Sequence, residues 1–395
     1  MDTSNYIKNI SCIGLGIIIP IIGAEFALRA IHYERPAFFA YDNDRGFGLR
    51  PGVKGYWTQE GKGWVEINQS GYRDKQIESI PNESTLKIAV IGDSFTESLQ
   101  VNDSESWPRL VENQINTSPH CKITKKYPNG VEIINLGTSA TGTGLQLIAW
   151  KRDGIILKPN IVLLMMFLGN DIHDNLPVEK DDRAVIKLDQ KGNIFIDNSF
   201  RKNLRSKLSQ SSVGKILDFL IMHSRVFQLA NEGKNLLARY LENSHKTSNI
   251  EAEQNINYDL GLYTNSSSLS PGWVMTNHIL KEFKSLVGST GARLVLASTS
   301  TPEQVWPDRD WRNRQTIYKN FDWNKPEQKL KIIANSLKLP YLPLTPPLRD
   351  HVDKYQNYLH GFKSPLLGQG HWNLLGHKLA ANNIKSWLCN MEYYP

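Results

Sequence analysis

A serine that follows a predicted buried strand is the first feature of this sequence that can carry chemistry. Residues 86–91 form a compact apolar run rich in β-branched side chains, and Gly92, Asp93 and Ser94 come directly after it. A serine on a tight strand-to-helix turn has an exposed hydroxyl, and its backbone N–H can face a reacting oxyanion. Thr96 replaces the second glycine of a Gly-x-Ser-x-Gly elbow, so the predicted turn is of a different kind. Ser94 is therefore a candidate nucleophile.

Two further polar groups follow the ends of predicted strands. Gly137 comes after the strand predicted for residues 131–136, and Asn170 comes after the very apolar run 161–168. A glycine lets its backbone amide approach a substrate oxygen closely, and the Asn170 side chain can donate to a tetrahedral oxyanion. Taken alone, each residue is more typical of an ordinary turn. The glycine- and threonine-rich run 137–144 lacks the lysine of a phosphate-binding loop, which excludes nucleotide binding there.

A histidine near the C-terminus can act as the general base for this serine. His371 lies on a loop at the entry to a predicted final helix, where an imidazole can take the proton of a hydroxyl. His377 is the next histidine along the chain, but the two lack zinc-ligand spacing and no His-Glu-x-x-His pattern exists. We therefore expect no metal site.

The elements that must position these residues alternate between strands and helices. This alternation predicts an α/β fold with a doubly wound parallel sheet, in which ligands bind beyond the carboxyl ends of the strands. The candidate residues fall at those ends. Residues 175–270 break the alternation and are predicted to form an insertion over or beside the active site. We expect strands at residues 86–91, 131–136, 161–168, 293–297 and 340–344, and helices at 104–115, 145–151, 274–287 and 373–388.

Together these residues resemble the four signature blocks of the SGNH (GDSL-like) hydrolases. The blocks are Gly92-Asp93-Ser94, Gly137, Gly169-Asn170-Asp171 and His371, in the order and rough spacing of that family. The resemblance covers roughly residues 66–388. It extends to the segments 68–74 and 371–377, which look like those of bacterial, membrane-anchored members.

The resemblance implies a three-layer α/β/α, flavodoxin-like fold with no metal and no organic cofactor. It implies Ser94 as nucleophile, His371 as base, and an oxyanion hole formed by the amides of Ser94 and Gly137 and the side chain of Asn170. A serine esterase or acyltransferase of this kind is expected to act on an O-acyl ester. The expected substrate is an acetyl ester of an envelope carbohydrate. The alternatives are a non-catalytic glycan-binding protein that keeps the pocket, and a lipase-like esterase.

One position departs from the family pattern. An aspartate usually stands two or three residues before the histidine, where it orients the imidazole and stabilises its charged form. This sequence has Gln369 and Gly368 at those positions. Gln369 can accept a hydrogen bond from the imidazole, and a distant acid such as Asp350 is a second candidate. A Ser-His dyad and a loss of hydrolysis are the remaining alternatives.

The N-terminal segment is apolar enough to interact with a membrane. Residues 10–24 are nearly all apolar and, continued into the next turns, reach about the 20 residues that span a bilayer. We expect a membrane anchor over residues 1–33, with a cleaved signal peptide as the alternative. An extension at 34–86 is expected to pack on the core, followed by a hydrolase domain at 87–390 on the extracytoplasmic side.

The formal net charge of +7 is concentrated in one segment. Residues 201–246 carry nine Lys or Arg against three Asp or Glu, which nearly accounts for the whole excess. A local cationic segment fits a membrane surface or an anionic polymer at least as well as a nucleic acid, and we expect no nucleic-acid partner.

Two of the three cysteines can form a disulfide. In a flavodoxin-like sheet the first and last helices pack side by side on one face. Cys121 follows the first of these helices, and Cys389 lies at the end of the last. Their Cα atoms can therefore approach the roughly 4.4–6.8 Å that a disulfide requires, and an oxidising compartment would let the bond persist. The alternative is two unrelated thiols.

Overall fold

The chain forms two compact units in its computed structural model. One unit comprises residues 39–206 and 256–395, and the other comprises residues 1–38 and 207–255. The structure describes residues 3–76, 83–178, 182–247, 260–264, 267–315 and 318–391; side chains are described for these except 3–15, 17, 239 and 242–247.

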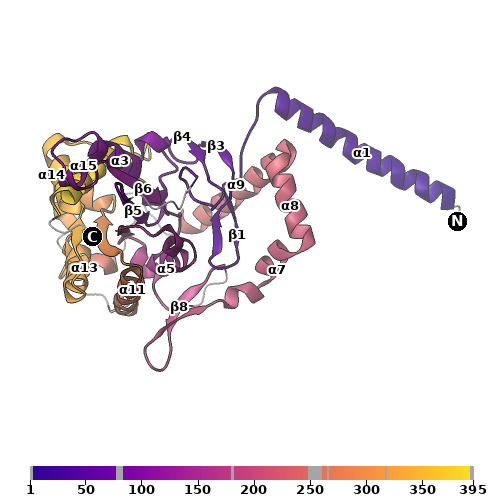
Figure 1. The fold of residues 1–395 in the computed structure, drawn as a ribbon. Coiled ribbons are helices and arrows are strands. Elements are labelled where there is room, and N and C mark those ends of the chain that lie inside the picture. Colours follow the sequence, from indigo (N-terminus) through magenta and orange to yellow (C-terminus); the bar gives the residue numbers. More distant parts are fainter. Residues whose placement is uncertain are drawn as a thin grey trace. The chain divides into compact units, whose positions relative to one another are not determined.

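The larger unit is built on a five-stranded parallel sheet (Figure 1). Along the sheet the strands lie in the order β11-β10-β7-β5-β6. Renumbered by sequence, this is the order 2-1-3-4-5 of flavodoxin-like folds, which confirms the predicted doubly wound sheet. The strands are β5 (Leu86–Ile91), β6 (Val131–Asn135), β7 (Ile161–Phe167), β10 (Arg293–Thr299) and β11 (Tyr341–Pro343).

Helices cover both faces of this sheet, so the unit has three layers (Figure 1). Alternate residues of β5 enter two separate hydrophobic clusters, with Ile88 and Val90 in one and Ala89 and Ile91 in the other. The continuous apolar sequence of the strand follows from this burial on both faces. One face carries α3 (Trp107–Asn116), α14 (Thr345–Tyr355) and α15 (Leu374–Asn390), and the other carries α5 (Thr143–Ala149), α11 (Ser270–Ser289) and α13 (Lys325–Ser336).

Two short hairpins precede the sheet and belong to the same unit. The first pairs β1 (Phe39–Asp42) with β2 (Gly46–Leu49), and the second pairs β3 (Lys54–Trp57) with β4 (Gly63–Glu66). Both pairs are antiparallel.

The predicted insertion at 175–270 is divided between the two units. Its first part, a β8–β9 hairpin, belongs to the larger unit, and its long helices α8 and α9 belong to the smaller one. Residues 179–181, 248–259 and 265–266 of this insertion lie outside the described residues. The elements not yet given are β8 (Val185–Leu188), β9 (Ile194–Asp197), α2 (Ser94–Glu97), α4 (Lys122–Lys126), α6 (Asp171–Asp174), α7 (Leu204–Gln210), α8 (Ser212–His223), α9 (Arg225–Thr247), α10 (Leu260–Tyr263) and α12 (Arg309–Arg314).

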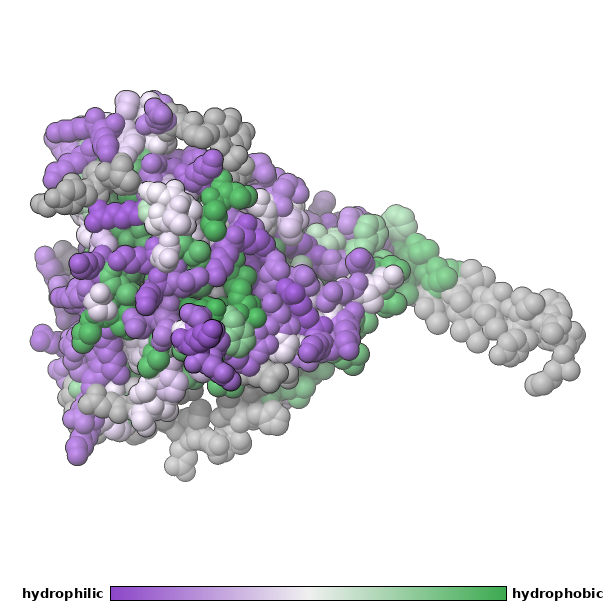
Figure 2. Space-filling view, turned by 60° about the horizontal axis from the view of Figure 1, so that its bottom comes forward, coloured by the Kyte–Doolittle hydropathy of each residue, from purple (hydrophilic) through white to green (hydrophobic). Residues whose placement is uncertain are grey.

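The smaller unit contains the N-terminal helix α1 (Thr3–Ala30). Figure 2 shows hydrophobic side chains at the surface of the described part of this helix. Among the described residues, no helix combines the length and the apolar character needed to cross a membrane. The structure therefore does not support the predicted transmembrane anchor, much of which falls on residues 1–15 and lies outside the described side chains.

The predicted disulfide is confirmed. Cys121 and Cys389 are bonded, and their Cα atoms are 4.8 Å apart. Helices α3 and α15 pack against each other on one face of the sheet, which brings the residue before α4 to the end of α15. The bond therefore cross-links the start of α4 to the end of α15 on this face of the sheet.

Candidate active site

Ser94 and His371 meet at the carboxyl edge of the sheet. Ser94 is the first residue of α2, directly after β5, and His371 lies on the loop that enters α15. The Nε2 of His371 lies 2.8 Å from the Oγ of Ser94. Asn373 fixes the histidine loop, because its side-chain oxygen caps α15 through the amide of Leu375 while its side-chain nitrogen donates to the carbonyl of Tyr358. The distance of 2.8 Å between the Nε2 of His371 and the Oγ of Ser94 is that of a nucleophile hydrogen-bonded to its base.

The acid that orients this histidine is Glu60, on the turn between β3 and β4. One carboxylate oxygen of Glu60 lies 2.5 Å from Nδ1 of His371, and the other accepts the backbone N–H of His371 at 2.7 Å. The prediction of Gln369 as orienter is therefore wrong. Gln369 and the second candidate, Asp350, are both exposed, whereas Glu60 reaches the imidazole from a segment far away in the sequence.

A glycine beside the histidine makes this contact possible. Gly370 has a φ of +72°, and a Cβ atom at this position would lie 2.3 Å from the carboxylate of Glu60. Any other residue would push the carboxylate away from His371 and would adopt an unfavourable left-handed conformation. In the sequence, the residue that comes closest to indicating this contact is Gly370. A glycine indicates only that some group approaches its backbone, and it does not identify that group as Glu60.

The electrostatics of the site favour the charged imidazolium. Burial opposes protonation of His371, but the hydrogen bond and charge of Glu60, with the charges of Asp93 and Glu97, outweigh it and raise the pKa of His371. Burial favours the neutral form of Glu60, but the hydrogen bonds and the charge of His371 outweigh this effect, so the pKa of Glu60 is lowered overall. The pair is thus an ion pair whenever the imidazole is protonated, which is the state that a general base reaches during catalysis.

The turn that carries Ser94 is held by Asp93. The Asp93 side chain caps α2 by accepting the N–H of Phe95 at 3.0 Å. Burial raises the pKa of Asp93 to about 6. As the first residue of its helix, Ser94 has a backbone N–H without an intrahelical acceptor, so this amide is available to a ligand. β5 and β7, which precede Ser94 and Asn170, flank the point where the strand order reverses, the usual ligand site of such sheets.

Gly137 is not placed as the resemblance implied. Its N–H donates to the side-chain oxygen of Asn135 at 2.9 Å, and Gly137 does not line the pocket that contains Ser94. A Cβ atom on Gly137 would lie 2.4 Å from the backbone nitrogen of Glu97. The glycine therefore serves the close approach of the loop after β6 to α2, which is a packing role.

The segment 68–74, which looked like a family feature, ties the hairpins to the catalytic turn. Arg73 is almost fully buried and donates to the carbonyls of Ser98 and Val101, the latter at 2.6 Å, just after α2. Asp74 forms an ion pair with Arg109 and accepts the N–H of Asn135, the last residue of β6, at 2.5 Å. The segment therefore braces both loops that border Ser94.

A pocket of about 590 Å³ opens at Ser94 and His371. Ser94, His371 and Asn170 line it, and all of its lining residues belong to the larger unit. This volume is typical of a small-molecule site with an apolar wall and a few polar groups. The aromatic wall of the pocket was not predicted from the sequence, in which its only signal is the aromatic-rich composition of residues 34–86. The wall comprises Phe39, Tyr41, Phe47 and Trp57, from β1, β2 and β3.

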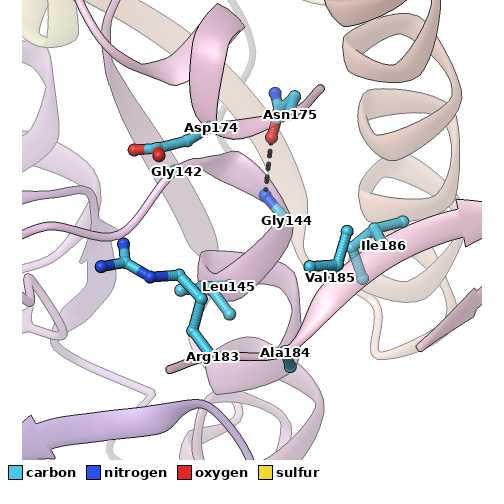
Figure 3. A pocket seen from close by; sticks show the side chains of 9 residues that line it. All are labelled: Gly142, Gly144, Leu145, Asp174, Asn175, Arg183, Ala184, Val185 and Ile186. Atoms are coloured by element: carbon cyan, nitrogen blue, oxygen red, sulfur yellow. Dashed lines mark hydrogen bonds between the residues drawn. The ribbon is translucent and has the colours of Figure 1, made fainter. Parts of the chain in front are cut away.

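A second, small cavity is lined by the loop after β6 with the start of α5, by the end of α6 and by β8 (Figure 3). Its volume is about 10 Å³, room for a single water. Asn175 accepts the N–H of Gly144 at 3.1 Å, as the dashed line in Figure 3 shows. Arg183 lines both cavities, and its guanidinium donates to the carbonyl of Ala140 at 2.9 Å, which holds this loop beside the main pocket.

Comparisons with known proteins give only distant likenesses. No family model and no curated protein matches the chain. Among solved structures, the chain resembles Axe2, an acetylxylan esterase from Geobacillus stearothermophilus, with 12% identity, coverage of 78% of this chain and 96% of that one, and a TM-score of 0.36. A lipolytic protein of the G-D-S-L family from Desulfitobacterium hafniense has 13% identity, 76% and 98% coverage, and a TM-score of 0.35.

LAE5, an alpha/beta hydrolase enzyme from the metagenome of Lake Arreo, has 13% identity, 77% and 96% coverage, and a TM-score of 0.38. Identities and TM-scores this low establish neither fold nor activity by themselves. The fold assignment therefore rests on the strand order, and the site assignment rests on the geometry around Ser94.

Proposed function

We propose that this chain is a serine esterase of the SGNH type that removes or transfers an O-acyl group through an acyl-enzyme on Ser94. The observation that carries the proposal is the continuous chain of hydrogen bonds from Ser94 through His371 to Glu60, at the wall of an open pocket. A nucleophile, a base and an acid in this order are the arrangement that activates a serine hydroxyl.

The geometry supports a two-step reaction. The Oγ of Ser94 attacks the ester carbonyl carbon while Nε2 of His371 takes the hydroxyl proton, and Glu60 stabilises the imidazolium that forms. The backbone N–H of Ser94 and the side chain of Asn170 are the proposed donors to the tetrahedral oxyanion. His371 then gives its proton to the leaving alcohol. In the second step His371 deprotonates a water or a sugar hydroxyl, which attacks the acyl group and releases Ser94.

We propose a carbohydrate ester as the substrate. The pocket is far larger than an acetyl group, so most of its volume is available to the alcohol part of the ester. Its wall presents aromatic rings from the two hairpins together with polar side chains such as Gln100 and Ser139. Such a mixture of apolar surface and a few polar groups suits a sugar ring, which combines C–H faces with hydroxyls.

The non-catalytic alternative loses its main support. A glycan-binding role was favoured by the lack of an acid next to the histidine, and Glu60 occupies that place in space. A serine-reactive fluorophosphonate probe separates the two roles. We expect the probe to label the wild type and not Ser94→Ala. Ser139→Ala, a matched change in another serine of the same pocket, should still be labelled. Absent wild-type labelling, or labelling that persists in Ser94→Ala, would contradict the proposed esterase.

We also propose that the larger unit works on the extracytoplasmic side of a membrane. The bond between Cys121 and Cys389 supports this, because disulfides persist in oxidising compartments and are rare in the cytosol. Alkylation of whole-cell protein with a mass-tagged thiol reagent tests this location. We expect only Cys12 to react before reduction, whereas three reactive cysteines would contradict the proposal.

A further inference from the structure

Gln100 brings a buried and unpaired amide to the wall of the main pocket. The residue lines the same pocket as Ser94 and His371. Its exposed fraction is only 3%, and within the part of the chain that the structure describes its amide oxygen meets no hydrogen-bond donor. Native proteins satisfy nearly all buried polar groups, so an exception on the wall of a ligand pocket calls for a specific explanation.

Other polar side chains of the pocket wall already have protein partners. The N–H of Ser139 donates to one carboxylate oxygen of Glu97 at 3.0 Å, and its hydroxyl donates to the other oxygen. Both carboxylate oxygens of Asp182 accept from the guanidinium of Arg183, at 2.9 and 3.0 Å. Gln100 differs from these residues because its amide oxygen remains unpaired.

The backbone of Gln100 is fixed by the elements that border the proposed active site. Its carbonyl accepts the N–H of Lys62 at 3.1 Å, on the turn between β3 and β4. Gly61 of this turn packs so closely that a Cβ atom there would collide with the same carbonyl oxygen. The carbonyl of the next residue, Val101, accepts from Arg73 at 2.6 Å. Gln100 is therefore held in place before a ligand enters, which is the usual condition for a selective contact.

The amide of Gln100 is chemically suited to a hydroxyl group. An amide side chain offers an acceptor oxygen and N–H donors, and a hydroxyl can be either partner. The terminal torsion of a glutamine is soft, so the oxygen or the nitrogen can turn toward a bound ligand. An apolar alcohol gives the amide oxygen no donor, and a site built around a hydrogen-bonding group rejects ligands that lack the matching group.

We propose that Gln100 is a specificity-determining residue that binds a ring hydroxyl on the alcohol part of the ester, so that sugar esters are preferred over esters of apolar alcohols. This proposal rests on the proposed esterase function and adds to it the residue that selects the substrate. The lipase-like alternative predicts the opposite preference, because an apolar alcohol has no group that pairs with the amide.

The kcat/KM values for two kinds of acetyl ester test this assignment. The esters are monoacetylated methyl hexosides of gluco, galacto and manno configuration, and cyclohexyl acetate, whose ring carries no hydroxyl. We expect the wild type to favour its best hexoside over cyclohexyl acetate by at least about tenfold. Gln100→Met replaces the amide by a thioether of similar length. In this variant the preference should fall at least about fivefold, while kcat/KM for cyclohexyl acetate stays the same or rises.

Gln146→Met is the matched control for the loss of a buried glutamine amide. Gln146 is 2% exposed, and its amide oxygen also lacks a donor among the described residues. Its amide nitrogen donates to the carbonyl of Thr141 at 2.8 Å, however, and Gln146 does not line the pocket. We therefore expect Gln146→Met to keep the wild-type preference for the hexoside.

Three results would overturn the assignment of Gln100. The wild type may hydrolyse cyclohexyl acetate as well as every hexoside, or Gln100→Met may keep the wild-type preference. Equal loss of both activities in Gln100→Met would give the residue a structural role instead. Failure of the esterase proposal is a different result and removes both proposals, because the wild type then hydrolyses none of the esters and the fluorophosphonate probe does not label Ser94.

Discussion

At the scale of single residues, the proposed catalysis depends on a contact between side chains 311 positions apart. Glu60 holds both the ring and the backbone of His371, so one carboxylate sets the orientation of the imidazole and compensates its charge. The neighbouring His377 has a different role. It is fully buried, its Nδ1 accepts the N–H of Trp107 at 3.3 Å, and burial lowers its pKa to about 3.

Replacing the acid should change both the rate and its pH dependence. In Glu60→Gln we expect kcat to fall roughly 10³–10⁴-fold, the loss that follows when the acid of such a triad becomes an amide. Only the neutral imidazole can accept a proton, so activity falls as pH drops through the pKa of His371. Because Glu60 raises that pKa, the acidic limb of kcat/KM should lie above 6.5 in the wild type and move to lower pH in the variant.

Two changes at the position that the sequence analysis favoured serve as controls. Gln369→Ala should leave kcat within about twofold of the wild type, since exposed side chains away from the chemistry have small effects. Gln369→Asp, which would restore the family's usual acid, should bring no gain because Glu60 already occupies the orienting position. An unshifted acidic limb in Glu60→Gln would show that another group orients His371.

The proposed oxyanion donor gives a second prediction at this scale. Asn170→Ala should lower kcat by roughly 10²–10³-fold with little change in KM, because an oxyanion donor acts mainly in the transition state. Steady-state kinetics on an acetyl ester measure both constants. A raised KM at unchanged kcat would mean that Asn170 binds the substrate in its ground state instead.

At the scale of elements, the sheet supplies only part of the proposed active site, and the two N-terminal hairpins supply the rest. The sheet brings Ser94, Asn170 and the loop of His371 to one edge. The hairpins add Glu60 and the aromatic wall. Arg73, on the segment that follows them, donates to the carbonyls of Trp64 on β4 and of Val101 after α2. The unit that holds the proposed active site therefore includes the two hairpins ahead of the first strand of the sheet.

The brace formed by Arg73 should be needed for stability as well as for activity. Arg73→Met keeps much of the side-chain volume but leaves the carbonyls of Ser98 and Val101 buried without their donors. We expect the free energy of unfolding to fall by roughly 2–5 kcal/mol, measured by urea titration. Arg314→Met, at an arginine whose side chain is 64% exposed, is the matched control and should change stability by less than about 0.5 kcal/mol. Equal effects of the two changes would contradict the bracing role.

What the sequence could and could not predict follows from the nature of each signal. The strands were predictable because burial on both faces leaves a continuous apolar run, and Ser94 and His371 because each stands at the border of such an element. Glu60 was not predictable, since it lies on a polar turn of a short hairpin and its partner is remote in sequence. Gly137 misled because a glycine needed for close packing looks the same as one needed for an amide donor.

At the scale of the whole molecule, the division into two units shows which part of the chain holds the proposed active site, and the disulfide cross-links that part. The loop closed by Cys121 and Cys389 spans 268 positions and includes Asn170, His371 and the last four strands of the sheet. The disulfide lies on the face of the sheet that is covered by α3, α14 and α15, and the loop of His371 leads into α15. The helices α1 and α8, with their exposed apolar side chains, belong to the other unit.

Removing this cross-link should destabilise the larger unit without altering the chemistry. In Cys121→Ser/Cys389→Ser we expect a lower urea midpoint, with a loss of up to about 5 kcal/mol in the chain-entropy account of so long a loop. At low temperature, kcat should stay near the wild-type value. Cys12→Ser leaves the pair intact and should unfold like the wild type. An unchanged midpoint in the double variant would show that the bond adds nothing to the stability of this layer.

Mass spectrometry of the protein quenched during turnover of an acetyl ester is the most direct test of the central claim, that Ser94 carries the acyl group. We expect an acetyl group on the peptide that contains Ser94 in the wild type. We expect none in Ser94→Ala or His371→Ala, and nearly complete loss of turnover in both, because nucleophile and base act as one unit. Turnover that continues in Ser94→Ala, or an acetyl group found on a different residue, would contradict the account.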